Sequence, residues 1–119
     1  MANYLDFVSI QVRDLERSKH FYHDLLDLKF EPNPPPHAVV FDRGNGTIFA
    51  VREPIMDLDS VISLGAGVAL WFTTSNTDVL HQKLVSANVK IIQEPQPGPF
   101  GKMMIAVDPD GYIITIHQA

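Results

Sequence analysis

The chain has 119 residues, of which 45% are hydrophobic, and 14 acidic against nine basic side chains give a formal net charge of −5 at pH 7. This size and composition predict one compact domain, residues 1–119. Cysteine is absent, which excludes disulfides, thiolate metal sites and cysteine nucleophiles. Because there is no long apolar run and no secretory signal, we expect a cytoplasmic protein without a membrane partner. The acidic balance argues against nucleic acid as a partner, since phosphate binding requires clustered Lys and Arg.

A strand followed by a helix is expected at the start of the chain. Residues 5–12 alternate between an apolar face and a mixed face. The mixed face consists of Phe7, Ser9 and Gln11. Asp14 is a typical helix N-cap, and apolar residues at helical spacing continue from there to about Asp27.

A hairpin is expected next. An extended piece, residues 28–30, leads into a proline-rich link, residues 32–36, that neither a helix nor a central strand accommodates. Two apolar runs follow at residues 37–41 and 46–51. The glycines and asparagine between them are typical of a hairpin turn.

The second half repeats this order. Residues 67–74 predict a strand, and Ser75 with Asp78 forms a capping box that starts a helix. The helix is expected to end near Asn88, a residue type that tolerates the left-handed conformation.

Three strands complete the second half. Residues 89–92 predict the first of them, and the other two, residues 103–107 and 112–117, pair as a hairpin. The Asp-Pro-Asp-Gly turn at residues 108–111 joins this pair. It is a strong turn signal, because proline fixes one φ angle and glycine permits a positive one.

The repeat determines the predicted fold. The first strands of the two halves lie about 62 residues apart, and the hairpin turns about 66 residues apart. Neither module, about 1–53 and 64–119, can close a core alone. We therefore predict an α+β fold in which two βαβββ modules form a curved mixed sheet around a cleft. An ordinary α+β domain with coincidental symmetry is the alternative.

Two segments carry a resemblance to a known family. They are Phe-Val-Ser-Ile-Gln-Val-Arg-Asp-Leu-Glu-Arg-Ser at residues 7–18, with the Phe-Tyr pair at 21–22 and Leu25, and the closing Asp-Pro-Asp-Gly-Tyr at 108–112. Both resemble the glyoxalase/bleomycin-resistance (vicinal oxygen chelate) family. The resemblance implies the fold above and a homodimer. It does not imply one activity, because the family includes isomerases, dioxygenases and drug-binding proteins.

The resemblance also allows a metal site to be tested. Metalloenzymes of the family hold one divalent metal with His, Gln or Glu from four strands. Those positions fall on Phe7, Ala50 (within one residue), Gly67 or its neighbour Val68, and Thr115. Hydrocarbon side chains cannot coordinate a metal, and a neutral hydroxyl is a poor ligand. We therefore predict no metal site and no cofactor.

The predicted cleft takes a small-molecule ligand. Its candidate lining residues are Phe7, Ser9, Gln11, Ala69, Trp71, Thr73, Met104, Thr115 and His117. Trp71, the only tryptophan, offers a stacking platform for a planar or cationic compound, or else part of a dimer interface. Met103 is expected in the core.

No catalytic residue is predicted beyond one weak candidate. His117 could act as a general base, and the alternative is a frayed residue near the chain end. The histidines at positions 20, 23 and 81 are expected on helix surfaces.

These features favour metal-independent binding of a small amphipathic or aromatic compound, as in the bleomycin-resistance branch, with drug sequestration as a consequence. Two alternatives stay open. One is a glyoxalase-like lyase, isomerase or dioxygenase with a non-standard metal site. The other is a regulatory or accessory module whose cleft is filled by Phe7 and Trp71.

Overall fold

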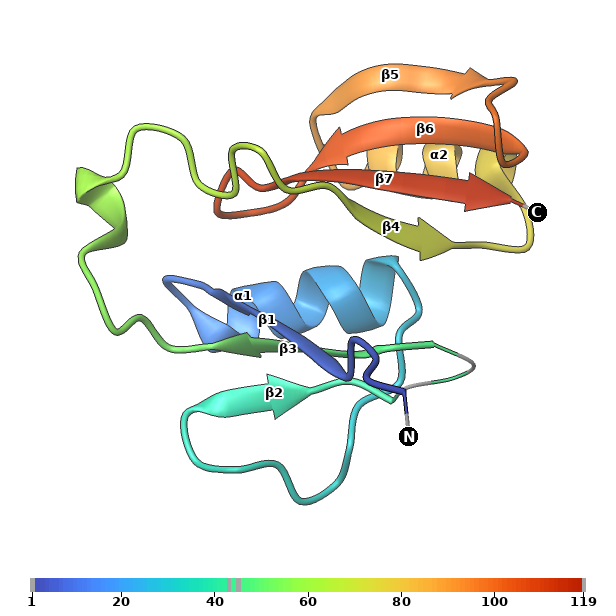
Figure 1. Cartoon of the computed structure of the whole chain (residues 1–119). Coiled ribbons are helices and arrows are strands. Elements are labelled where there is room, and N and C mark those ends of the chain that lie inside the picture. The colour runs from blue at the N-terminus through green and yellow to red at the C-terminus, as the bar shows by residue number, and fades with distance from the viewer. Residues whose placement is uncertain (1, 43, 45, 119) are drawn as a thin grey trace. The chain divides into compact units, whose positions relative to one another are not determined.

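The computed structural model describes residues 2–42, 44 and 46–118 (Figure 1). The chain divides into two compact units, residues 1–61 and 62–119. Each unit combines a small mixed sheet with a helix, which confirms the predicted α+β class. In the part of the chain that is described, no helix is long and apolar enough to cross a bilayer.

The first unit contains a three-stranded sheet. Its strands are β1 (Phe7–Gln11), β2 (Ala38–Val40) and β3 (Ile48–Arg52). Strand β3 lies in the centre, parallel to β1 and antiparallel to β2. The last strand of the unit thus separates the first two, so β1 forms one edge of the sheet.

The helix of the first unit begins where the sequence predicts. Asp14 is its N-cap, and a carboxylate oxygen of Asp14 accepts a hydrogen bond from the Arg17 amide at 3.2 Å. Helix α1 (Leu15–Lys19) then continues as a wider π-helical turn, η1 (His20–Leu25), which the apolar spacing does not distinguish from an α-helix. Just beyond η1, Asp27 has a φ of 61°. Its left-handed conformation ends the helix.

Aromatic side chains build the core of this unit. The fully buried Tyr22 ring lies 5.0 Å from the Phe49 ring and 5.9 Å from the Phe41 ring, centroid to centroid. Phe41 and Phe49 stack on each other at 5.7 Å. Because η1 supplies Tyr22 and β3 supplies Phe49, these contacts hold the helix against the sheet.

The extended piece predicted at residues 28–30 is reduced to a bridge between Phe30 and Phe41. One backbone hydrogen bond flanks it on each side, from the Glu31 amide to the Val40 carbonyl and from the Asp42 amide to the Lys29 carbonyl. The prolines that follow lack the amide hydrogen needed to extend the pairing. The hairpin turn predicted next includes residues 43 and 45, which lie outside the described residues.

The second unit contains a complete four-stranded sheet. Its strands are β4 (Leu70–Thr73), β5 (Ile91–Gln96), β6 (Lys102–Val107) and β7 (Ile113–Gln118), in the order β4-β7-β6-β5. As in the first unit, the first strand runs parallel to the last one. Helix α2 (Thr77–Ser86) packs on one face of this sheet (Figure 1).

The start of α2 differs from the prediction by one residue. The predicted capping box began at Ser75, but the N-cap is Asn76, whose side-chain oxygen accepts a hydrogen bond from the Val79 amide at 3.1 Å. Asn76 has an extended backbone, which aims its short amide at the first turn. The prediction for Asn88 is confirmed by its φ of 62°.

The turn between β6 and β7 forms as predicted. One carboxylate oxygen of the buried Asp108 accepts hydrogen bonds from the amides of Asp110 and Tyr112, both at 2.9 Å. Gly111 has a φ of +101°, a conformation that residues with a Cβ rarely adopt. This turn sets the register in which β6 pairs with β7.

Candidate ligand-binding face

The side of the β4–β7 sheet that α2 does not cover brings together most of the predicted ligand-binding residues. Trp71 on β4 lies beside Thr115 on β7, and Thr73 lies beside His117. The row of Trp71 and Thr115 continues with Ile105 on β6 and Gln93 on β5. The row of Thr73 and His117 continues with Met103 on β6 and Gln96 on β5. We call this surface the Trp71 face. It consists of Trp71, Thr73, Gln93, Gln96, Met103, Ile105, Thr115 and His117.

One predicted residue lies on the opposite side. Met104 pairs with Ile116, and both are fully buried on the side of the sheet that packs against α2. Met103 pairs with His117 and therefore belongs to the Trp71 face. The sequence prediction placed Met104 in the cleft and Met103 in the core, and the strand register reverses the two.

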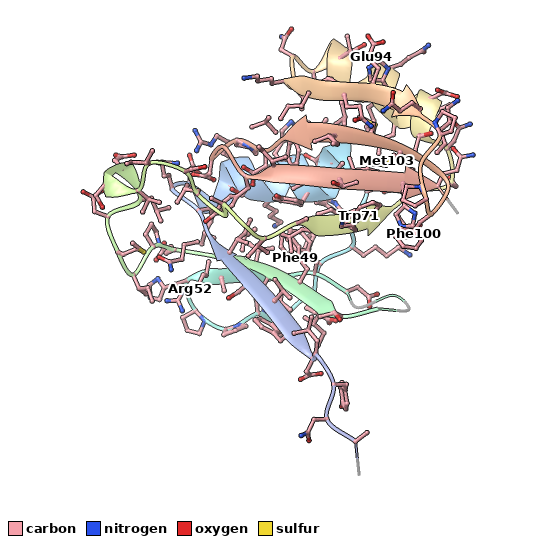
Figure 2. All side chains as sticks on the ribbon, turned by 45° about the horizontal axis from the view of Figure 1, so that its top comes forward. Phe49, Arg52, Trp71, Glu94, Phe100 and Met103 are labelled. Carbon is pink, nitrogen blue, oxygen red and sulfur yellow. The ribbon has the colours of Figure 1, made fainter. Side chains whose placement is uncertain are left out.

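An aromatic corner occupies one end of the Trp71 face (Figure 2). The Trp71 ring meets the Phe100 ring edge to face, with centroids 5.8 Å apart and planes at 81°. It meets the His117 ring in the same manner at 5.6 Å and 71°. Trp71 nevertheless remains 42% exposed, and Phe100 is 66% exposed. The corner thus fixes the indole between two neighbours and still leaves part of it open to a ligand.

His117 is held in place rather than frayed. It lies within β7, and its Nδ1 is 2.8 Å from the carbonyl oxygen of Phe100. A carbonyl oxygen can only accept, so Nδ1 must carry the hydrogen. In the neutral imidazole this leaves Nε2 as an acceptor without a hydrogen. The alternative of a frayed chain end is therefore wrong for His117.

The loop that carries Phe100 is tightly turned. The Gly98 amide donates a hydrogen bond to the Gly101 carbonyl at 3.1 Å, and Gly101 has a φ of +100°. A Cβ on Gly98 would lie only 2.5 Å from the sulfur of Met103. Glycine at both positions lets the loop fold back close to β6. Phe100 is not among the candidate lining residues, although the glycines on either side of it indicate a loop that can turn its ring toward the sheet.

The remaining predicted residues of the second unit differ in accessibility. Thr73 is exposed, whereas Thr115 is only 7% exposed because it lies between Trp71 and Ile105. Ala69 lies just before β4 and is exposed. Thr73 is thus the more accessible of the two threonine hydroxyls.

In the first unit, β1 carries three predicted residues. Phe7 is 46% exposed and Ser9 is exposed, on the side of the sheet opposite to the buried Phe49 and Val51. The side-chain oxygen of Gln11 accepts a hydrogen bond from the Ile55 amide at 2.9 Å. Gln11 therefore anchors the segment that follows β3, a structural role that the alternation pattern does not reveal.

The residues at the expected metal positions do not fit a metal ion. The N-caps Asp14 and Asn76 are equivalent in the two units, so Ala69, and not Gly67 or Val68, corresponds to Phe7. Ser9 and Trp71, two residues further along, are then equivalent as well. Because Ala50 pairs with Ser9 and Thr115 pairs with Trp71, Ala50 corresponds to Thr115. Among these four side chains only the threonine has an oxygen, and it is neutral. Within the described residues no group of three or more His, Asp or Glu side chains could hold an ion.

Two further histidines lie on η1 and bond to neighbours on the same segment. Nδ1 of His20 is 2.6 Å from a carboxylate oxygen of Asp24, and both side chains are exposed. Nδ1 of His23 is 2.7 Å from the Leu28 carbonyl oxygen. These contacts are those of a helix surface and its C-terminal end, not of a ligand site.

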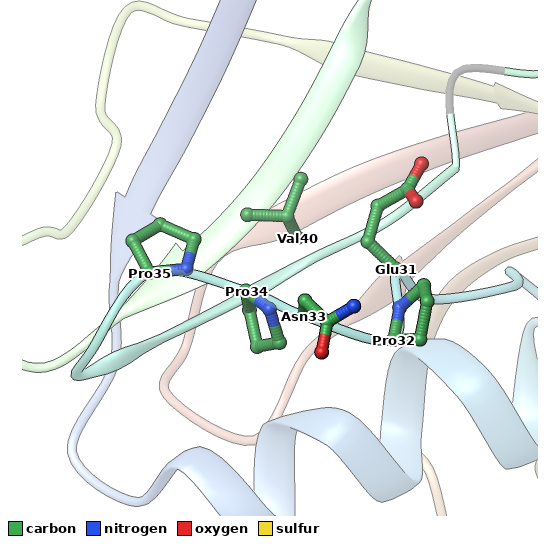
Figure 3. Close-up of a pocket in the computed structure, with 6 residues that line it drawn as sticks. All are labelled: Glu31, Pro32, Asn33, Pro34, Pro35 and Val40. Carbon is green, nitrogen blue, oxygen red and sulfur yellow. The ribbon is translucent and has the colours of Figure 1, made fainter.

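A separate shallow pocket of about 230 Å³ lies in the first unit (Figure 3). It is lined by Glu31, Pro32, Asn33, Pro34, Pro35 and Val40. None of the predicted ligand-binding residues is among them. The pocket is walled mainly by proline rings, and it offers neither an aromatic platform nor a hydrogen-bond donor apart from the Asn33 amide. The Trp71 face is the better candidate.

Most of the chain is similar to known proteins. The sequence model of the Glyoxalase/Bleomycin resistance protein/Dioxygenase superfamily matches residues 4–116. The chain belongs to this superfamily. The phenazine antibiotic resistance protein EhpR of Enterobacter agglomerans is 29% identical over 115 residues, which cover 90% of this chain and 85% of that protein.

Solved structures show the same superfamily fold. A protein of unknown function from Agrobacterium tumefaciens is 26% identical, with a TM-score of 0.77 and coverage of 100% of this chain and 95% of that one. TnmS3, an antibiotic-binding protein from Streptomyces sp. CB03234, is 21% identical, with a TM-score of 0.74 and coverage of 98% and 96%. One relative of the chain is thus named for antibiotic resistance, and a protein of the same fold is named for antibiotic binding.

Proposed function

We propose that this chain binds a planar aromatic compound, such as a phenazine-type antibiotic, on the Trp71 face, and that it does so without a metal ion. The observation that carries the proposal is the partly exposed indole of Trp71, held edge to face between Phe100 and His117. A ring fixed in this way loses little conformational freedom when a second ring stacks on it, so more of the stacking energy appears as affinity.

The composition of the face supports an aromatic ligand. Ile105 and Met103 continue the apolar surface away from Trp71, and a methionine side chain adapts to ligands of irregular outline. Four strands at a spacing of about 4.8 Å give the row from Trp71 to Gln93 a length of about 14 Å. That length suits a ligand of several fused rings. The threonines, the glutamines and His117 lie among these apolar side chains and offer hydrogen-bond partners that can orient a ligand.

The relatives give independent support for the ligand class. The name of EhpR describes resistance to a phenazine antibiotic, and TnmS3 is described as antibiotic-binding. Sequestration of a toxic aromatic compound by this chain would protect a cell without any chemical change to the compound. No reaction has to be assumed, and none of the side chains at the expected metal positions is a good ligand for the metal ion that serves the metalloenzymes as a Lewis acid.

Equilibrium dialysis against phenazine, in the presence of EDTA, tests the proposal. We expect the protein to concentrate phenazine on its side of the membrane and to release it chemically unchanged on denaturation, as mass spectrometry would show. A Trp71→Ala variant should retain much less. Binding that disappears with EDTA, or recovery of a modified compound, would favour the enzyme alternative instead.

A further inference from the structure

The polar groups of the Trp71 face are not equivalent in what they can select. The threonine hydroxyls at 73 and 115 and the glutamine amides at 93 and 96 can each donate or accept a hydrogen bond. They can therefore bind a ligand group that donates a hydrogen bond or one that accepts it. A neutral imidazole whose Nδ1 hydrogen is already engaged has only its other nitrogen left, as an acceptor. That nitrogen favours a ligand group that donates a hydrogen bond and disfavours one that can only accept.

His117 is such a group. Its Nδ1 donates to the Phe100 carbonyl oxygen at 2.8 Å, and among the described residues Nε2 has no hydrogen-bond partner. Since no buried side-chain nitrogen in the described chain lacks a partner, Nε2 is not fully buried. The ring lies 5.6 Å from the Trp71 ring, so a compound stacked on the indole brings its edge near His117.

We propose that His117 makes the Trp71 face selective for aromatic compounds that carry a hydrogen-bond donor, a phenolic hydroxyl or a ring N–H, at the edge that reaches Nε2. This inference rests on the proposed function, since it names the feature by which the same face chooses among planar ligands.

The bond to Phe100 contributes to this selectivity in two ways. It fixes the tautomer, so the acceptor is in place before the ligand arrives. It also polarises the ring, because a hydrogen bond donated through one nitrogen strengthens the acceptor at the other. The loop that holds the Phe100 carbonyl is therefore a positioning element, and Gly101, with its positive φ, shapes it.

The probes are phenazine, 2-hydroxyphenazine and 2-methoxyphenazine, titrated by calorimetry. The hydroxyl and methoxy compounds share an oxygen acceptor, and only the hydroxyl compound has a donor, which the methoxy compound replaces by a methyl group. We expect the wild-type chain to prefer the hydroxyl compound by roughly three- to tenfold, the range of one hydrogen bond. The preference should vanish in His117→Phe, which keeps a ring beside Trp71 and removes both nitrogens. It should persist in His81→Phe, a change on α2.

A second measurement does not depend on the folding of a variant. The nitrogen signals of the His117 ring in the wild-type chain should show a protonated Nδ1 and a bare Nε2. Only the hydroxyl compound should shift the Nε2 signal. A protonated Nε2, or an equal shift with the methoxy compound, would overturn the inference.

The loop is tested with a matched pair of glycines. Gly101→Ala and Gly111→Ala each force an alanine to a φ near +100°, but Gly111 lies in the turn at the opposite end of β6 and β7. We expect Gly101→Ala alone to lower the hydroxyl preference.

Three results distinguish the possible failures. Equal affinity of wild type for the hydroxyl and methoxy compounds, with clear binding of all three probes, would reject the inference and leave the proposed function standing. A hydroxyl preference that survives in His117→Phe would reject His117 as the acceptor. No binding of any probe would reject the proposed function and the inference together.

Discussion

Replacing Trp71 by alanine should weaken phenazine binding strongly with little effect on folding. The indole is 42% exposed. Of a tryptophan surface of roughly 250 Å², about 100 Å² is therefore open to a ligand. A planar compound that covers half of it removes about 50 Å² from water, which is worth about 1.3 kcal/mol at about 25 cal/mol per Å². Edge-to-face or offset stacking adds about 1 kcal/mol.

The sum of about 2 kcal/mol corresponds to roughly thirtyfold in Kd. Isothermal titration with phenazine should show this loss for Trp71→Ala and a smaller one for Trp71→Phe, which keeps one ring. Val85→Ala is the control, because Val85 is an exposed apolar residue on α2, which packs on the other side of the sheet. If both Trp71 variants bound within about twofold of wild type, stacking on this indole could not be the source of affinity.

Three further predictions concern the second unit and the metal positions. Met104→Ala should lower the free energy of unfolding, measured by urea denaturation, by about 2–5 kcal/mol, since the side chain is fully buried. Met103→Ala should weaken phenazine binding and lower the free energy of unfolding much less. The opposite pattern would contradict the register of β6. Gln118→Ala should cost about 1–3 kcal/mol in the same assay, because the Gln118 side-chain oxygen accepts from both the amide and the hydroxyl of the buried Thr77; unchanged stability would show that water replaces it. Elemental analysis after dialysis against a buffer with divalent metals should find no retained ion, and one ion per chain would overturn the reading of the metal positions.

The sequence predicts most of one side of the Trp71 face because β4 and β7 alternate without interruption. Trp71, Thr115 and His117 therefore share a side, as the pattern requires. The error at the methionines arises from register. The turn at residues 108–111 pairs Val107 with Ile113, which brings Met103, and not Met104, opposite His117. Counting back from the turn, rather than along β6 alone, would have given the correct side.

Other parts of the site depend on features that alternation does not contain. The pairing of β5 with β6 shifts register between Ile91 and Gln93 and again between Gln93 and Gln96. Those irregularities turn both glutamines to the Trp71 face, which a strict two-residue period cannot predict. Phe100 reaches Trp71 through a loop fold that depends on backbone angles at glycine, and these are not encoded in hydrophobic spacing.

The most direct test of the account is the fluorescence of Trp71 during titration with phenazine. The chain has one tryptophan, so the whole signal comes from the proposed stacking platform. We expect saturable quenching that a second planar compound relieves by competition and that EDTA does not change. If the emission stays constant while calorimetry reports binding, the ligand lies elsewhere on the molecule and the Trp71 face is not the site.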